Sequence, residues 1–207
     1  MNNGIMIVLD GSNGAGKSTV IKAVKEYIES RQLEVVMTRE PGGTPIGEKL
    51  RNIILSKEHP EMDDLTELML FGAGRAQHLA EKIYPALESG KVVLSDRFDS
   101  ATISFQHFAR GIDRELVDKI NNLALNGFSP TLTIILDLDP RIGLDRVRSR
   151  GEGLDRLEDQ DLLFLDRARN GYLRQAEEFP NKFYVIDASQ SLEKVISEAI
   201  LAVEQLL

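Results

Sequence analysis

The sequence contains no cysteine. This absence excludes a disulfide framework and a thiolate metal site. The three histidines, His59, His78 and His107, show none of the spacings that are typical of metal ligands. Any bound metal must therefore be held by oxygen atoms.

Long hydrophobic runs are also missing from the sequence. No stretch approaches the roughly 20 apolar residues that a membrane-spanning helix needs. The chain starts with Met-Asn-Asn-Gly, which carries no basic group ahead of the first short apolar run, as a secretion signal would. We therefore expect a soluble cytoplasmic protein with no membrane partner.

Basic side chains are in the minority. The chain carries 25 lysines and arginines against 33 aspartates and glutamates, which gives a net charge of −8. This balance argues against a broad nucleic-acid surface, so we expect no nucleic-acid partner. An anionic small-molecule substrate would have to be bound by a few focused arginines.

The residues that are present indicate one compact α/β domain over residues 1–207. A chain of 207 residues with 42% hydrophobic content can bury one continuous core, and no linker, repeat or low-complexity segment divides it. Five short apolar runs predict buried strands, at residues 5–9, 35–37, 92–94, 132–138 and 183–186. Amphipathic segments between them predict helices. This alternation is typical of a parallel sheet that is covered by helices on both faces and binds ligands at the carboxyl ends of its strands.

Two of the predicted helices have recognisable sequence signals. Asp139-Pro140 is typical of an N-cap followed by proline at the first helical position. Residues 191–206 predict a helix with one apolar stripe, formed by Leu192, Val195, Ile196, Ala199 and Val203.

A phosphate-binding motif, G-x-x-x-x-G-K-[ST], follows the first predicted strand. It comprises Gly11, Ser12, Asn13, Gly14, Ala15, Gly16, Lys17 and Ser18, and Thr19 opens a helical pattern over residues 19–28. Glycines let backbone N–H groups curl around a phosphate, and the helix N-terminus adds partial positive charge. We expect residues 11–19 to bind a nucleoside triphosphate, with Lys17 bridging the β- and γ-phosphates and Ser18 offering its hydroxyl to Mg²⁺.

Two charged segments follow the second and third predicted strands. Residues 38–44, Thr-Arg-Glu-Pro-Gly-Gly-Thr, place Arg39 beside glycines that allow close backbone approach. Residues 95–98, Ser-Asp-Arg-Phe, place Asp96 where it can reach metal-bound water and Arg97 where it can clamp a phosphate. Taken alone, each segment is equally typical of a charged surface turn. The phosphate loop by itself leaves a kinase, an ATPase and a GTPase switch open, although no Asn-Lys-x-Asp guanine-binding motif occurs.

The order of these motifs resembles that of the thymidylate (dTMP) kinases over essentially the whole chain. The shared segments are the phosphate loop, residues 38–44, residues 71–77 (Phe-Gly-Ala-Gly-Arg-Ala-Gln), residues 96–98, and an arginine-rich stretch before residues 154–158 (Leu-Asp-Arg-Leu-Glu). Residues 38–44 are the most specific of these. The resemblance implies a P-loop three-layer α/β sandwich, with a five-stranded parallel sheet and a small lid at about residues 141–158. It also implies ATP-dependent phosphorylation of dTMP to dTDP for DNA precursor synthesis, with Mg²⁺, and a homodimer.

The resemblance assigns residues to the substrate as well. They are Asp10, Arg39, Phe71, Arg75, Arg97, Thr102 and Gln106. Arg39 and Arg97 would hold the acceptor phosphate, Phe71 would pack on the base, and Arg75 would donate a hydrogen bond to its exocyclic oxygen. Helical spacing supports part of this, because Phe71, Arg75 and His78 fall at i, i+4 and i+7 and share one face. The alternative is an arginine that lies beside a core phenylalanine.

Arginines are concentrated in the expected lid. They are Arg141, Arg146, Arg148, Arg150 and Arg156, and two glycines, Gly151 and Gly153, lie among them. As a plain charge run this stretch would be a solvated face. Members of the family carry the catalytic arginine either in the lid or in the phosphate loop, and this loop has Ala15 and no arginine, so the chain resembles the bacterial type with a basic lid. Our catalytic candidates are Lys17, Arg97, Arg148 and Arg150, with Arg156 behind them.

Two positions depart from the family's pattern. Asn13 stands where many members carry an acid that contacts the sugar 3′-hydroxyl, and Ile103 stands where bacterial relatives often carry glutamine. A kinase that phosphorylates another pyrimidine deoxynucleoside monophosphate, such as a 5-modified dUMP, is therefore the alternative among enzymes. The alternative that is not a kinase is a nucleotide-dependent switch or binding protein without transfer activity, although a switch has no use for a second phosphate pocket.

Overall fold

The computed structural model describes residues 4–149 and 154–207. Its strands form one parallel, five-stranded sheet in the order β2-β3-β1-β4-β5. The strands are β1 (Met6–Gly11), β2 (Val35–Arg39), β3 (Val92–Asp96), β4 (Leu132–Asp137) and β5 (Phe183–Asp187). All five strands predicted from the apolar runs are confirmed, and their ends lie within two residues of the predicted ones.

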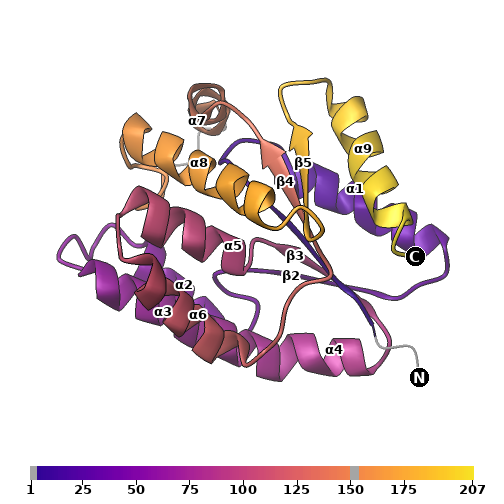
Figure 1. Ribbon diagram of the computed structural model, residues 1–207, viewed down its shortest axis with the longest axis horizontal. Helices are drawn as coiled ribbons and strands as arrows, with labels where there is room; N and C mark the ends of the chain where they lie inside the picture. Colours follow the sequence, from indigo (N-terminus) through magenta and orange to yellow (C-terminus); the bar gives the residue numbers. More distant parts are fainter. Residues whose placement is uncertain (1–3, 150–153) are drawn as a thin grey trace.

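Helices cover both faces of the sheet (Figure 1). Helices α1 (Lys17–Ser30) and α9 (Leu192–Glu204) pack on one face. The others are α2 (Pro45–Leu55), α3 (Asp64–His78), η1 (Leu79–Ile83), α4 (Tyr84–Glu88), α5 (Asp99–Thr102), η2 (Ile103–Ala109), α6 (Arg114–Leu125), α7 (Pro140–Arg148) and α8 (Leu162–Glu178). The opposite face is covered by η1, α4, η2 and α8, of which η1 and η2 are π-helical. The three-layer arrangement expected from the sequence is confirmed. No helix in the described part of the chain is long and apolar enough to cross a membrane.

The cap predicted at Asp139 is found at the start of α7, and the structure adds a cap at the start of α9. The carboxylate of Asp139 accepts a hydrogen bond from the backbone N of Arg141, with Pro140 as the first helical residue. Ser191 caps α9 by accepting from the backbone N of Lys194. The predicted apolar stripe of α9 is wrong at Leu192, which is 47% exposed because it lies in the first turn, beyond the face that packs on the sheet.

The register of the sheet determines where the charged strand ends meet. Leu9 pairs with Asp96 between β1 and β3, and Arg39 pairs with the same residue between β2 and β3. The phosphate loop leaves β1 at Gly11, so it starts beside the charged end of β3, with the charged end of β2 one strand further.

Candidate active site

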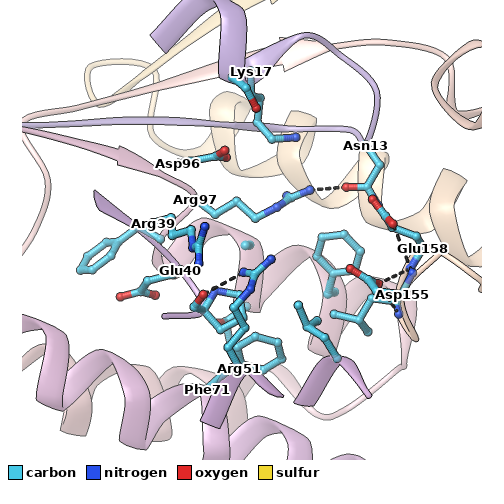
Figure 2. Close-up of a pocket in the computed structure, with 18 of the residues that line it drawn as sticks. Asn13, Lys17, Arg39, Glu40, Arg51, Phe71, Asp96, Arg97, Asp155 and Glu158 are labelled. Atoms are coloured by element: carbon cyan, nitrogen blue, oxygen red, sulfur yellow. Dashed lines mark hydrogen bonds between the residues drawn. The ribbon is translucent and has the colours of Figure 1, made fainter. Parts of the chain in front are cut away.

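One cavity of about 470 Å³ lies at the carboxyl ends of the strands. Its wall is built from the phosphate loop, the ends of β2 and β3, parts of α2 and α3, the α5–η2 helix and residues 155–158. In Figure 2, Lys17 and Asp96 lie together at one end of the group, and Arg51 and Phe71 lie at the other. Residues expected to bind a donor and residues expected to bind an acceptor therefore share one continuous space.

Most of the predicted site residues line this cavity. They are Asn13, Gly14, Gly16, Lys17, Ser18, Arg39, Phe71, Arg75, Asp96, Arg97, Thr102 and Gln106. The predicted residues that the structure describes but that do not line it are Asp10, Gly11, Ser12, Ala15, Thr19 and Arg148. Arg150 lies outside the described residues.

The phosphate loop has a backbone shape that depends on its glycines. The φ angle is +120° at Gly11, +74° at Gly14 and +91° at Gly16, a region that other residues rarely adopt. A side chain at Gly14 would also collide with the backbone of Gly143 in α7. A side chain at Gly143 would in turn collide with the carbonyl oxygen of Asn13. The loop and α7 are therefore packed backbone against backbone.

Lys17 folds back onto its own loop. Its Nζ donates to the carbonyl oxygens of Gly11, at 3.1 Å, and Ser12, at 2.9 Å. Burial and the positive charge of Arg97 lower the pKa of Lys17 to about 8. An anionic phosphate in the loop would offer Lys17 a better partner than these neutral carbonyls, and it would favour the protonated amine.

Arg97 is held beside the phosphate loop by several acceptors. Its Nη1 donates to Oδ1 of Asp10 at 2.9 Å and to the hydroxyl of Tyr172 at 2.7 Å, and its Nη2 donates to Oδ1 of Asn13 (Figure 2). Although burial opposes its charge, the neighbouring Tyr172, Asp10 and Asp96 raise the pKa of Arg97 above its ordinary value. Arg97 is therefore a permanent cation in the cavity wall. Asp10 is fully buried beneath it and does not line the cavity, so the structure gives Asp10 a positioning role.

Two further arginines face the same part of the cavity. Arg39 at the end of β2 donates to Glu48 at 2.9 Å, and Arg51 on α2 donates to the carbonyl oxygen of Pro41 at 2.8 Å. Burial and the nearby charge of Arg39 lower the pKa of Arg51. The lowered pKa means that the charged form of Arg51 is destabilised in this position. An anion placed between the two guanidinium groups would stabilise it.

Arg75 is buried at the far end of the cavity with most of its donors in use. Its Nε and Nη2 donate to Oε2 of Glu40 at 3.0 and 2.7 Å, and its Nη1 donates to Oδ1 of Asn121 at 2.6 Å. Nη2 also donates to the carbonyl oxygen of Phe98 and to Oγ1 of Thr102. These bonds fix the plane of the guanidinium and leave one N–H of Nη1 without an intramolecular acceptor among the described residues.

The predicted face of α3 is formed by two of its three expected residues. Phe71 and Arg75 line the cavity, but His78 does not. His78 is fully buried, with Nδ1 3.0 Å from Oε1 of Glu40 and Nε2 2.6 Å from Oγ1 of Thr38. It supports the segment after β2, which packs against that side of the helix.

The residues expected to hold a metal are suitable for magnesium. Ser18 at the start of α1 and Asp96 at the end of β3 both line the cavity and both offer oxygen atoms. The described residues contain no cluster of three or more histidines and carboxylates that could hold a metal ion by themselves. This donor set suits an ion that takes most of its oxygen ligands from phosphates and water.

The two described ends of the lid segment contact opposite sides of the cavity. At one end, Arg146 on α7 donates to the carbonyl oxygen of Gly14 at 3.3 Å, and Arg148 is exposed at the last residue of α7. At the other end, Arg156 donates to the carbonyl oxygen of Ile54 at 2.8 Å and pairs with Glu67. One described end of the segment thus contacts the donor side, and the other contacts the acceptor side.

Comparison with known proteins supports one family. The family model for thymidylate kinase matches residues 9–199. The chain is 46% identical to a thymidylate kinase of Geobacillus thermodenitrificans over 202 residues, which covers 97% of this chain and 90% of that protein. It is 42% identical to a thymidylate kinase of Halalkalibacterium halodurans, with 100% of this chain and 99% of that protein aligned. A crystal structure of thymidylate kinase from Ehrlichia chaffeensis superposes with a TM-score of 0.79 at 30% identity, covering 98% of this chain and 99% of that one.

The chain belongs to the thymidylate kinase family. The family resemblance inferred from the motifs is confirmed, as is the α/β fold that it implied.

Several cavity residues of this thymidylate kinase family member were not among the site residues predicted from its sequence. Arg51, Glu40 and Phe105 line the cavity, as do Asp155 and Glu158 of the lid segment. Asp155 and Glu158 form a local turn, in which Oδ1 of Asp155 accepts from the backbone N of Glu158 at 2.8 Å and Oε2 of Glu158 accepts from the backbone N of Asp155 at 3.3 Å. Glu40, Asp155 and Glu158 stand in the two family segments 38–44 and 154–158, so the motifs were the available signal for them. Arg51 and Phe105 lie outside those segments, and only the tertiary structure distinguishes them.

Proposed function

We propose that the protein transfers the γ-phosphoryl group of ATP to dTMP, giving ADP and dTDP for DNA precursor synthesis in the cytoplasm. The observation that carries the proposal is one cavity in which the phosphate loop faces Arg39, Arg51 and Arg97. Membership of the thymidylate kinase family supports dTMP as the acceptor. Phosphoryl transfer requires a site for the donor phosphates and a separate cationic site for the acceptor phosphate, held in line with one another.

Residues 11–19 bind the donor in this proposal. The loop N–H groups and the N-terminus of α1 surround the β-phosphate, and Lys17 exchanges the carbonyls of Gly11 and Ser12 for phosphate oxygens. Mg²⁺ would be held by Ser18 directly and by Asp96 through water, and when bound it neutralises charge on the donor phosphates.

The acceptor base lies against Phe71 at the other end of the cavity. Arg75 has donors only, so it suits the O4 carbonyl of thymine, with Thr102 beside it. Gln106 lies one helical turn after Thr102 and suits the N3–H of the same base edge. The polar edge of the base thus forms hydrogen bonds with fixed polar groups, and the face of the base packs on an aromatic ring.

Transfer itself needs positioning and neutralisation of charge. The acceptor phosphate oxygen is already anionic, so no general base is required. Arg97 holds that phosphate, and Arg148 and Arg150 are proposed to approach the transferred group when the lid closes and excludes water.

The test is a panel of acceptors incubated with ATP and Mg²⁺. We expect dTMP to be converted to dTDP with stoichiometric ADP, and slower transfer to dUMP and dCMP. Transfer to no monophosphate, with ATP hydrolysis persisting, would support a nucleotide-dependent switch. A preferred acceptor other than dTMP would support the alternative kinase.

We also propose a homodimer formed through α2, α3 and α6. Each of these helices exposes a pair of apolar residues at helical spacing, namely Ile46 and Ile53, Leu65 and Met69, and Leu116 and Leu123. The three helices lie together on one side of the molecule (Figure 1). Light scattering should give twice the chain mass, and Leu123→Glu should yield a monomer, whereas Leu163→Glu on α8 should stay dimeric. A monomeric wild-type protein would contradict the proposal.

A further inference from the structure

Glu67 is a fully buried carboxylate that the reaction described above does not use. It lies in α3, one turn before Phe71. Its Oε1 accepts from Nε of Arg110 at 2.7 Å and from Nε2 of Gln106 at 2.8 Å. Its Oε2 accepts from Nη2 of Arg110 at 2.9 Å and from Arg156.

These contacts keep Glu67 ionised and fixed. Burial opposes ionisation, but the hydrogen bonds and charge of Arg110, together with Gln106 and Arg156, lower the pKa of Glu67 below its ordinary value. Arg110 is itself held by Asp64 at 3.2 Å. The carboxylate therefore has no freedom to rotate away from Gln106.

An ionised carboxylate offers acceptors only, and this determines which way the Gln106 amide points. The NH₂ group must face Glu67, so the carbonyl Oε1 must point elsewhere. Oε1 accepts no hydrogen bond from the described residues. In the described part of the chain, Nδ2 of Asn121 is the one fully buried side-chain polar atom without a hydrogen-bond partner. Oε1 of Gln106 also lacks a partner, so it cannot be fully buried. It is therefore accessible from the cavity that Gln106 lines.

We propose that Glu67 is a positioning residue that makes the cavity selective for a base with a ring N–H donor. This inference rests on the proposed function. By presenting the carbonyl of Gln106, Glu67 favours thymine and uracil, whose N3 carries a proton, and disfavours cytosine, whose N3 is an acceptor. The discrimination is exerted through Gln106, because Glu67 does not line the cavity.

Substituting Glu67 by glutamine should reverse this orientation. A glutamine at position 67 has one oxygen and one NH₂ group. Two arginine donors, from Arg110 and Arg156, reach the Oε2 position, whereas one, Nε of Arg110, reaches the Oε1 position. The oxygen should therefore remain at the Oε2 position, and the NH₂ group should face Gln106. Gln106 would then turn its carbonyl toward residue 67 and present its NH₂ group, a donor that suits N3 of cytosine.

The experiment compares kcat/KM for dTMP, dUMP and dCMP in three proteins: wild type, Glu67→Gln and Asp64→Asn. Asp64→Asn is the matched control, because it makes the same carboxylate-to-amide change on α3 beside Arg110 without a contact to Gln106. We expect Glu67→Gln to lower the ratio of kcat/KM for dTMP to that for dCMP by about 10-fold or more, as is typical for a reversed donor–acceptor pair. Asp64→Asn should leave the ratio within about twofold, since it alters no group that reads the base.

The ratio separates positioning from general structural support. A purely structural role would lower kcat/KM for all three acceptors alike, so an unchanged ratio in an active Glu67→Gln variant would overturn the inference. A wild-type protein that phosphorylates none of the three acceptors would instead contradict the proposed function.

A second measurement needs no substitution in α3 and covers the case in which Glu67→Gln fails to fold. In the ¹⁵N-labelled wild-type protein, the Nε2 protons of Gln106 should exchange slowly with solvent and show cross-relaxation to the γ protons of Glu67. We expect this both without acceptor and with dTMP. Rapid exchange without such contacts would overturn the assigned orientation.

Discussion

The carboxylate of Asp10 lies beneath the guanidinium of Arg97, with Oδ1 of Asp10 2.9 Å from Nη1 of Arg97. The same carboxylate accepts from the hydroxyls of Tyr172 and Ser100, each at 2.7 Å. A buried anion with this many donors fixes the cation above it, and it does so before any substrate arrives.

Asp10→Asn should therefore destabilise the fold as well as the site. The uncompensated charge of buried Arg97 is expected to cost about 3–5 kcal/mol in the free energy of unfolding. Urea unfolding at constant m-value measures this. Asp137→Asn is the control, because Asp137 pairs with Arg169 in a more exposed position and should cost less. Equal losses in the two variants would show that burial of the pair does not matter.

Binding of ATP should take up a proton at mildly alkaline pH. The pKa of Lys17 is about 8 in the free protein, and bound phosphate should raise it. Below pH 8 the amine is protonated in both states, so affinity is constant, and above pH 8 affinity falls as pH rises. With a pKa of about 8, roughly one molecule in ten is protonated at pH 9, so ATP should bind ~10-fold more weakly there.

Calorimetry in buffers of different ionisation enthalpy would detect this uptake. Lys17→Arg keeps its charge at these pH values, so its ATP affinity should be weaker but independent of pH. If the variant shows the same pH dependence as the wild type, the titrating group is not Lys17.

Arg51→Ala should weaken binding of the acceptor. Loss of a charge-assisted contact is expected to raise the KM for dTMP by about 10- to 100-fold, with a smaller effect on the KM for ATP. Lys49→Ala removes a cation from an exposed position of the same helix and should leave both values unchanged. Steady-state kinetics with each substrate varied in turn tests the assignment, and equal effects on both KM values would refute it.

Arg148→Ala and Arg150→Ala should lower turnover far more than nucleotide affinity. Arginines that act on the transferred group typically contribute about 10³- to 10⁵-fold to the rate. Arg167→Ala on α8 is an exposed control that should retain wild-type turnover. A fall in kcat matched by an equal loss of ATP affinity, or no fall in the double variant, would exclude a transition-state role.

The sequence predicted the elements whose signals are local. Buried strands, the phosphate loop and the cap of α7 each depend on residues a few positions apart, so periodicity and motif were sufficient. Arg51 and Glu67 gave no such signal, because a charged residue on an amphipathic helix looks the same whether it faces solvent or a cavity. Glu67 is buried only because Arg110 and Arg156, distant in the sequence, lie beside it.

The tight packing of Gly143 against the carbonyl of Asn13 constrains how this protein can diverge. Any side chain at position 143 would displace the phosphate loop at the residue that contacts Arg97. Inherited changes in the loop and in α7 should therefore occur together, although the two lie far apart along the chain. Among homologues, a larger residue at position 143 should be accompanied by an altered residue or backbone at position 13.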